Sequence, residues 1–290
     1  MKRSFTGYGP ALMRAAENLL PEDRRLFEDP YSEKFLSPFW KFWVILMHSP
    51  KIFDAFIKIR EKRTPGIIGG MICRTRYIDD VLNNAIEEGI GAVVNLGAGM
   101  DTRAFRISGI KNIQYFELDF PELQKTKRSY IDKKIGELPS NVILVPIDFD
   151  RQDIGDELQK AGYSLSTKTL FMWEGVTQYI SKEAVDETIK FVAQASAGSK
   201  IVFTYVLDSF ITGSYVPDGL NGLYKYTVKK KNPLWISGFD PAEMADYLSK
   251  YSLNVIEDVG HTEYLERYLK PGGRDLKVFE IERTVLAAVK

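Results

Sequence analysis

The sequence predicts an α/β protein built on a doubly wound, mostly parallel seven-stranded sheet. Short, nearly continuous apolar runs rich in β-branched residues alternate along the chain with segments of helical periodicity. One run leads directly into Gly97-Ala98-Gly99, and a glycine-rich turn after a strand is typical of such sheets. The chain has 290 residues, of which 44% are hydrophobic, and this length is sufficient to bury a large core.

Helices are expected to fill residues 1–90, which we interpret as an N-terminal helical cap. Pro10 suits the first turn of a helix that ends before Pro21. Apolar residues at helical spacing over residues 78–86 indicate a second helix, closed by Gly89.

The sheet is expected within residues 91–290. Seven apolar runs are read as its strands: residues 92–96, 113–118, 142–147, 169–173, 200–207, 253–256 and 276–283. Ser181 begins a helix after the fourth strand, and Asp240-Pro241 combines an N-cap residue with a proline at the first helical position. Residues 208–238 carry glycine, proline, lysine and aromatic residues without periodicity, so a long loop or lid is expected there.

Composition excludes several classes of protein. Basic and acidic residues both number 39, so no basic excess points to nucleic acid. The single cysteine, Cys73, fits a reducing compartment, and with only two histidines no metal site is expected. The most apolar stretch, residues 35–59, is interrupted by charged residues and cannot span a bilayer. We therefore expect a cytoplasmic protein with neither nucleic acid nor membrane as partner.

The glycine turn indicates a cofactor site. Glycines after a buried strand allow the backbone to approach a ligand closely, whereas the plain alternative is a tight turn without a ligand. Position 102 is threonine where a dinucleotide fingerprint has its third glycine, and Asp101 places a carboxylate where a pyrophosphate would lie. A nucleoside cofactor without pyrophosphate fits better.

Acidic residues end the following strands. Glu117 and Asp119 end the second strand, where related folds bind ribose hydroxyls, although Glu117 is interpreted mainly as a helix cap. Asp148 and Asp150 follow the third strand, and Glu174 follows the fourth. Acids at successive strand ends predict a site for a cationic, hydroxyl-rich ligand.

Several spaced motifs give the chain a family resemblance. They are Asn95 to Arg103, Phe116 to Pro121, Glu174 to Tyr179, Arg74 to Asp79, and Arg267 to Arg274 with Ile281 to Arg283. With these motifs the chain resembles the leucine carboxyl methyltransferase family, in particular its bacterial and archaeal small-molecule O-methyltransferase branch. The resemblance implies a Rossmann-like methyltransferase sheet. Residues 91–290 would then bind S-adenosylmethionine, which is converted to S-adenosylhomocysteine.

The resemblance also implies roles for cofactor-binding residues. Arg74 would pair with the methionine carboxylate of the cofactor, a task that suits the guanidinium fork. The Gly97-Ala98-Gly99 turn would line the methionine and ribose, and Asp119 would accept the ribose hydroxyls. Asp148 and Phe149 would hold the adenine.

Two residues are implied near the methyl group. Glu174 would lie near the amino group and the sulfonium, with a part in both binding and catalysis. Tyr179 would position the acceptor.

The expected function is O-methylation of a carboxylate or acidic hydroxyl on a small molecule. One alternative is methylation of a protein C-terminal carboxylate, and a further one is a nicotinamide-dependent oxidoreductase, which the missing third glycine disfavours. His48 is interpreted as facing the acceptor pocket or packing in the cap, and His261 as capping a helix or lying exposed. Aromatic residues of the cap favour an apolar small acceptor, or else form core: Phe39, Trp40, Phe42, Trp43, Phe53 and Phe56.

Overall fold

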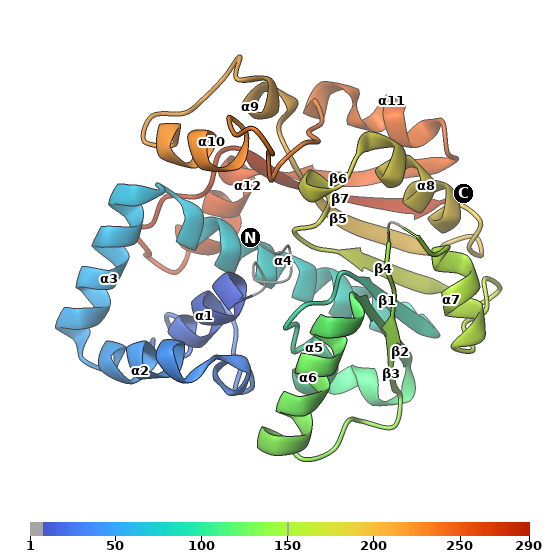
Figure 1. Cartoon of the computed structure of the whole chain (residues 1–290), viewed down its shortest axis with the longest axis horizontal. Helices are drawn as coiled ribbons and strands as arrows, with labels where there is room; N and C mark the ends of the chain where they lie inside the picture. Colours follow the sequence, from blue (N-terminus) through green and yellow to red (C-terminus); the bar gives the residue numbers. More distant parts are fainter. Residues whose placement is uncertain (1–7, 150) are drawn as a thin grey trace.

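In a computed structural model, the chain is described over residues 8–149 and 151–290. One sheet of seven strands runs through the middle of the molecule, with helices on both of its faces (Figure 1). The strands are β1 (Ala92–Leu96), β2 (Gln114–Asp119), β3 (Val142–Pro146), β4 (Thr169–Trp173), β5 (Lys200–Val206), β6 (Leu253–Val259) and β7 (Glu282–Val289).

The strand order is β3-β2-β1-β4-β5-β7-β6, and β7 runs antiparallel to the other six strands. Crossovers run to both sides of β1, so the predicted doubly wound, mostly parallel sheet is confirmed. Alternate side chains of β1 enter two apolar clusters, with Val94 in one and Val93 in the other. Because successive side chains of a strand point to opposite faces, both faces of the sheet are buried, which explains the continuous apolar runs.

The predicted position of the last strand is wrong. The strand was expected at 276–283, but β7 begins only at Glu282. The preceding segment packs instead against the start of the long helix α4, where an added Cβ on Gly69 would lie 2.1 Å from the Lys277 carbonyl oxygen. Val278 and Phe279 are buried there by helix packing, so their apolar character reflects a tertiary contact and not a strand.

Helices precede and connect the strands. The α-helices are α1 (Tyr8–Glu17), α2 (Pro38–Met47), α3 (Pro50–Arg63), α4 (Ile67–Glu87), α5 (Arg103–Arg106), α6 (Pro121–Lys134), α7 (Ile154–Lys160), α8 (Lys182–Val192), α9 (Asp208–Thr212), α10 (Asn221–Thr227), α11 (Met244–Ser249) and α12 (His261–Tyr264). Short 3-10 turns cover Ser32–Phe35, Ser108–Asn112, Thr177–Tyr179 and Pro241–Glu243, and a π-turn covers Leu265–Leu269.

Several predicted helix starts are confirmed. The Ser181 hydroxyl accepts a hydrogen bond from the Ala184 N–H and caps α8. The Asp240 carboxylate accepts from the Ala242 N–H, although a 3-10 turn precedes α11 there. Pro10 lies in the first turn of α1, which starts two residues earlier than expected.

The helical cap consists of α1, α2 and α3, which gather beside α4 at one end of the molecule (Figure 1). They share an apolar cluster that includes Leu12, Phe35 and Met47. Helix α4 contributes to this cluster through Ile68 and to the core under the sheet through Ile78. The division of the chain at residue 90 therefore stays a prediction.

The segment expected to be a loop or lid at 208–238 contains the two short helices α9 and α10. Phe210, Leu220 and Trp235 of this segment form an apolar cluster with Phe279 and Ile281, so it is held on the body by packing. Within residues 8–149 and 151–290, no helix is both long and apolar enough to cross a membrane.

Candidate active site

A cavity of about 1360 Å³ opens at the carboxyl edge of the parallel strands. The turns after β1, β2 and β4 form its floor, and residues of α1, α4 and α10 border it. Parallel strands place the residues that follow them along one edge, which is where doubly wound sheets bind ligands. The polar residues predicted from separate parts of the sequence therefore meet in one place.

The glycine turn forms the inner wall of this cavity. Gly97 and Gly99 have φ angles of +72° and +50°, values that glycine adopts readily. The N–H groups of Gly97 and Ala98 donate to the Leu118 carbonyl at 2.9 and 3.0 Å, which fixes the turn against β2. An added Cβ on Gly97 would lie 2.5 Å from a Val176 methyl carbon, so only glycine fits there.

Asp119, the last residue of β2, is buried beside the glycine turn. Its Oδ2 accepts the Gly99 N–H at 2.6 Å, and its Oδ1 accepts the Phe120 N–H at 2.7 Å. Burial raises the pKa of Asp119, although the two N–H donors act in the opposite direction. The carboxylate is thus fixed in orientation at the cavity wall.

Arg74 of α4 reaches across the cavity to two carboxylates. Its Nε donates to Glu174 Oε1 at 2.9 Å, and its Nη1 donates to Glu282 Oε1 at 2.7 Å. Burial alone would lower the pKa of Arg74, but Glu282 and Glu174 keep it above its ordinary value. An added Cβ on Gly175 would lie 3.7 Å from Arg74 Nη2, so glycine leaves this side of the guanidinium open to the cavity.

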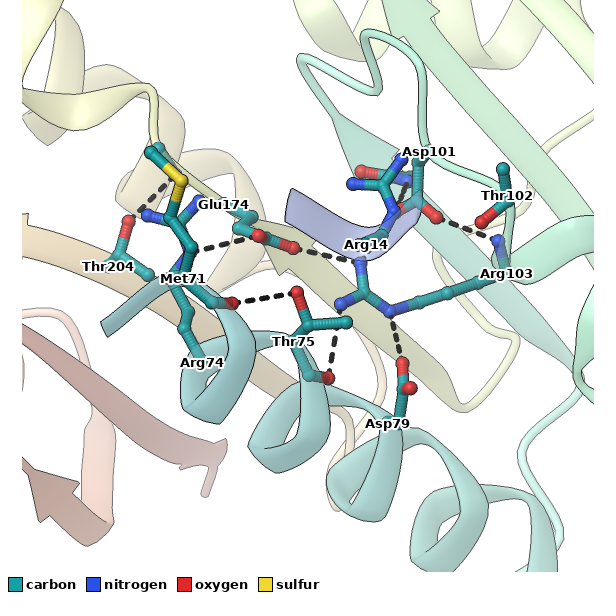
Figure 2. Close-up of polar contacts among 12 residues, drawn as sticks. Arg14, Met71, Arg74, Thr75, Asp79, Asp101, Thr102, Arg103, Glu174 and Thr204 are labelled. Atoms are coloured by element: carbon teal, nitrogen blue, oxygen red, sulfur yellow. Dashed lines mark hydrogen bonds and ion pairs between the residues drawn. The ribbon is translucent and has the colours of Figure 1, made fainter. Parts of the chain in front are cut away.

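Arg103 holds Glu174 from the opposite side. Its Nη1 donates to Glu174 Oε2 at 2.8 Å and to Asp101 Oδ2 at 2.6 Å, and its Nε donates to Asp79 Oδ1 at 2.7 Å. Figure 2 shows Arg103 between Asp79 on α4 and the carboxylate of Glu174. Burial would raise the pKa of Glu174, but Arg103 and Arg74 lower it, so this carboxylate is ionised.

Aromatic and aliphatic side chains line the opposite part of the cavity. The ring of Tyr179 meets Trp235 edge-on, with ring centres 6.4 Å apart. Ile67, Leu223 and Phe279 complete this wall. The cavity therefore joins a charged region beside the glycine turn to an apolar region beside α10.

A family model described as leucine carboxyl methyltransferase matches residues 7–193 of the chain. The chain belongs to the leucine carboxyl methyltransferase family. It is an S-adenosyl-L-methionine-dependent methyltransferase of that family, so the cofactor and the family expected from the sequence are confirmed. The nicotinamide-dependent alternative is wrong.

Bacterial relatives of this family resemble the chain over most of its length. A Frankia alni protein provisionally named as an S-adenosyl-L-methionine-dependent methyltransferase is 30% identical over 208 residues, which cover 71% of this chain and 70% of that protein. A Streptomyces coelicolor protein with the same provisional description is 28% identical over 240 residues, covering 80% of this chain and 81% of that protein.

Solved structures share the fold. A DUF574-family protein from Streptomyces avermitilis superposes with a TM-score of 0.58 and 13% identity, covering 96% of this chain and 97% of that chain. A provisionally assigned methyltransferase from Thermobifida fusca superposes with a TM-score of 0.56 and 14% identity, covering 96% of this chain and 94% of that chain. At such identities the likeness shows the methyltransferase fold alone.

Most residues predicted for the site of this methyltransferase line the one cavity: Arg74, Gly97, Ala98, Gly99, Asp119, Phe149, Glu174 and Tyr179. Asp148 is not among its lining residues. The Asp148 N–H donates to Gln152 Oε1 at 2.9 Å, and its carboxylate lies 3.7 Å from Arg151 Nε. Its adenine role stays a prediction, and Asp150 lies outside the described residues.

Other candidate residues lie away from the cavity. Glu117 is buried in the core, where its Oε2 lies 2.5 Å from Lys127 Nζ, so it contacts a buried lysine instead of capping the helix. His48 is exposed and its Nδ1 contacts the Val44 carbonyl oxygen, whereas His261 contacts the Thr262 hydroxyl. Neither histidine lines the cavity, and no cluster of metal-ligating side chains occurs among the described residues.

The aromatic residues of the cap also lie outside the cavity. Phe39, Phe42 and Trp43 are exposed on α2, while Trp40, Phe53 and Phe56 pack against the cap cluster. Trp40, Phe53 and Phe56 therefore fit the alternative that the cap aromatics form core, and none of the six rings lines the cavity. The apolar wall comes instead from the segment read as a lid and from the loop before β7.

Arg103 and Glu282, which hold Glu174 and Arg74, had no role predicted from the sequence. Arg103 ends the motif from Asn95 to Arg103. Its position two residues after Asp101 was the signal that could have identified it as a partner of the site carboxylates. Glu282 was missed because the last strand was misplaced. Because β7 runs antiparallel, its first residue lies at the edge where the parallel strands end.

Proposed function

We propose that this methyltransferase transfers the methyl group to the oxygen of a carboxylate or acidic hydroxyl on a small molecule with an apolar body. The observation that carries the proposal is the composition of the acceptor end of the cavity. Tyr179 brings a hydroxyl group to a wall that contains Trp235, Leu223 and Phe279. Among the described lining residues there is no histidine or cysteine, so an acceptor that is already anionic fits this wall best.

The charged end of the cavity fits the cofactor. The backbone of the Gly97–Gly99 turn leaves room for a ligand, and Asp119 presents an oriented carboxylate that can accept ribose hydroxyls. Arg74 presents a guanidinium suited to the methionine carboxylate. Glu174 provides an ionised carboxylate for the amino group, and Phe149 provides an aromatic surface for the adenine.

When bound, S-adenosylmethionine supplies a methyl group on a positively charged sulfur, which is already a strong electrophile. The protein mainly has to bring the acceptor oxygen within about 3 Å of that carbon and align it opposite the sulfur. Tyr179 would orient the acceptor oxygen by hydrogen bonding and would take no proton. Glu174, fixed by Arg74 and Arg103, would hold the amino group without moving. The apolar wall excludes water from the acceptor.

Replacing Tyr179 by phenylalanine tests this assignment. We expect Tyr179→Phe to lower kcat at least tenfold with benzoic acids and phenols as probe acceptors, because a positioning contact is lost. Calorimetry should show S-adenosylmethionine affinity within about twofold of the parent. Tyr215→Phe, which changes an exposed tyrosine, is the matched control. Unchanged turnover, or an equal loss of cofactor affinity, would remove Tyr179 from the acceptor site.

The pH profile distinguishes the two acceptor classes. With a carboxylic acid the rate should stay nearly flat between about pH 6 and 8, because the reference pKa of such an acid lies near 4. A steep rise that is abolished by His48→Ala or His261→Ala would show a histidine base and a hydroxyl acceptor. Methylation of a peptide C-terminal carboxylate in preference to every small acid would favour the protein-directed alternative.

A further inference from the structure

Helices α2 and α3 carry large apolar side chains on the outside of the molecule. Five of them are between 38% and 62% exposed: Phe39, Phe42, Trp43, Ile45 and Ile59. Helix α3 has fourteen residues and none of them is buried. Large apolar side chains that are exposed together on neighbouring helices usually mark a surface that binds a partner.

The exposed face is distinct from the face that packs on the protein. Val44 and Met47 of α2 are buried in the cap cluster, and Phe53 and Phe56 of α3 pack against it. Phe39 and Phe42, three positions apart, lie on the side of α2 away from Val44, and Trp43 borders the buried side. None of Phe39, Phe42 and Trp43 belongs to the cap cluster.

The same region is strongly basic in a chain of zero net charge. Residues 38–63 contain six lysines and arginines but only two acidic residues, a net charge of +4. Residues 225–231, on and after α10, add four exposed lysines and no acid. An added Cβ on Gly219 would lie 2.7 Å from Pro65, so the segment before α10 touches the end of α3, and Figure 1 shows α10 beside it.

We propose that this face of α2 and α3 binds the surface of an anionic lipid bilayer. Exposed phenylalanine, tryptophan and isoleucine side chains enter the boundary between headgroups and acyl chains, while lysines and arginines contact anionic headgroups. A second copy of the chain fits less well, because two faces of net charge +4 would meet. The expectation of no membrane partner rested on a segment too interrupted by charge to span a bilayer, whereas this proposal concerns a peripheral contact with the membrane surface.

Vesicle sedimentation with the full chain tests the proposal. The parent should bind vesicles of phosphatidylcholine with one quarter phosphatidylglycerol, and binding should fall steeply between 50 and about 500 mM salt. The double variant Phe42→Ser, Trp43→Ser should weaken this binding at least tenfold, because it removes two apolar side chains that would pass from water into the bilayer. Lys58→Glu with Lys62→Glu should weaken it without changing the apolar face. Ile256→Ser, on β6, is the matched control for an exposed apolar residue.

Three results would overturn the proposal. These are equal binding to pure phosphatidylcholine vesicles, unchanged binding by the Phe42→Ser, Trp43→Ser variant, and self-association through this face without vesicle binding. Sedimentation equilibrium without vesicles detects the last one. Circular dichroism of each variant confirms that the substitutions, which lie on the surface, leave the fold intact.

Discussion

Asp119 has both carboxylate oxygens engaged before any ligand binds. Each oxygen accepts one backbone N–H, and each has a second lone pair available for a hydroxyl. Two donors from the protein fix the orientation of the carboxylate, so a ligand does not have to order it. The residue thus combines a rigid position with remaining acceptor capacity.

Removing this carboxylate should therefore affect the cofactor directly. We expect Asp119→Ala to weaken S-adenosylmethionine binding by about 1–3 kcal/mol, the range for a charge-assisted hydrogen bond. Isothermal titration calorimetry measures the change, and Asp132→Ala on the exposed side of α6 is the control. Unchanged affinity in a folded Asp119→Ala protein would place the ribose elsewhere.

Glu117 makes stability depend on pH. Burial raises the pKa of Glu117 to about 7, although Lys127 acts to lower it. Between the unfolded value near 4.5 and about 7 the folded state retains a proton that the unfolded state has lost. Stability should therefore fall as pH rises through this window, by up to about 3 kcal/mol.

Urea unfolding at pH 5 and pH 7.5 tests this expectation. Glu117→Gln should flatten the dependence, whereas Glu122→Gln on the exposed side of α6 should retain it. The same slope in the parent and in Glu117→Gln would mean that Glu117 is ionised in the folded protein.

At the scale of single residues, the sequence predicts where a charged side chain lies better than it predicts which side chain it pairs with. Asp119 and Glu174 were identified because acids that follow parallel strands meet at one edge of the sheet, whereas Arg74 was identified from the family resemblance. Their pairing could not be predicted, because Arg103 and Glu282 reach Glu174 and Arg74 through contacts between elements distant in the chain. Such contacts depend on helix and strand placement, which local patterns do not contain.

At the scale of elements, strand identity was predictable where burial on both faces left continuous apolar runs. It failed at 276–281, where the apolar residues are buried by α4 instead of by neighbouring strands. A strand buried in a sheet and a loop buried under a helix both require apolar residues, so hydrophobicity alone cannot distinguish the two. The close approach of α4 to this segment depends on Gly69 and Gly70.

Adding one methyl group to this contact should destabilise the protein. Gly69→Ala would place a Cβ 2.1 Å from the Lys277 carbonyl oxygen, and we expect a loss of about 1–3 kcal/mol in the free energy of unfolding. Gly222→Ala in α10 meets no atom within 4 Å and should be neutral or stabilising by up to about 1 kcal/mol. Chemical denaturation compares the two. Equal stability of both variants would contradict the close packing.

At the scale of the whole molecule, the cavity joins the cap to the sheet. Pro10 and Arg14 of α1 line it together with the turns after three strands. The Arg14 Nη2 donates to the Met100 carbonyl at 2.6 Å, which links the cap to the glycine turn. A ligand that fills the cavity would therefore contact both parts.

Hydrogen exchange should show this coupling. Saturating S-adenosylmethionine should slow amide exchange in α1 and α4 as well as in residues 97–101, because binding stabilises every segment that forms the site. Amide exchange in α11 is the control, because none of its residues lines the cavity. The comparison is made under conditions in which exchange occurs by local opening of the structure and not by global unfolding. Protection limited to residues 97–101 would show that the cap binds no part of the cofactor.

Strand β7 is the last of the sheet in chain order, yet it lies between β5 and β6. While the protein is being synthesised on the ribosome, β5 has an open edge and β6 has no neighbour until residues 282–289 emerge. Glu282 arrives with this strand, so Arg74 lacks one of its two carboxylate partners until then. A nascent chain therefore lacks part of the charged network around Arg74 until residue 282 has been made.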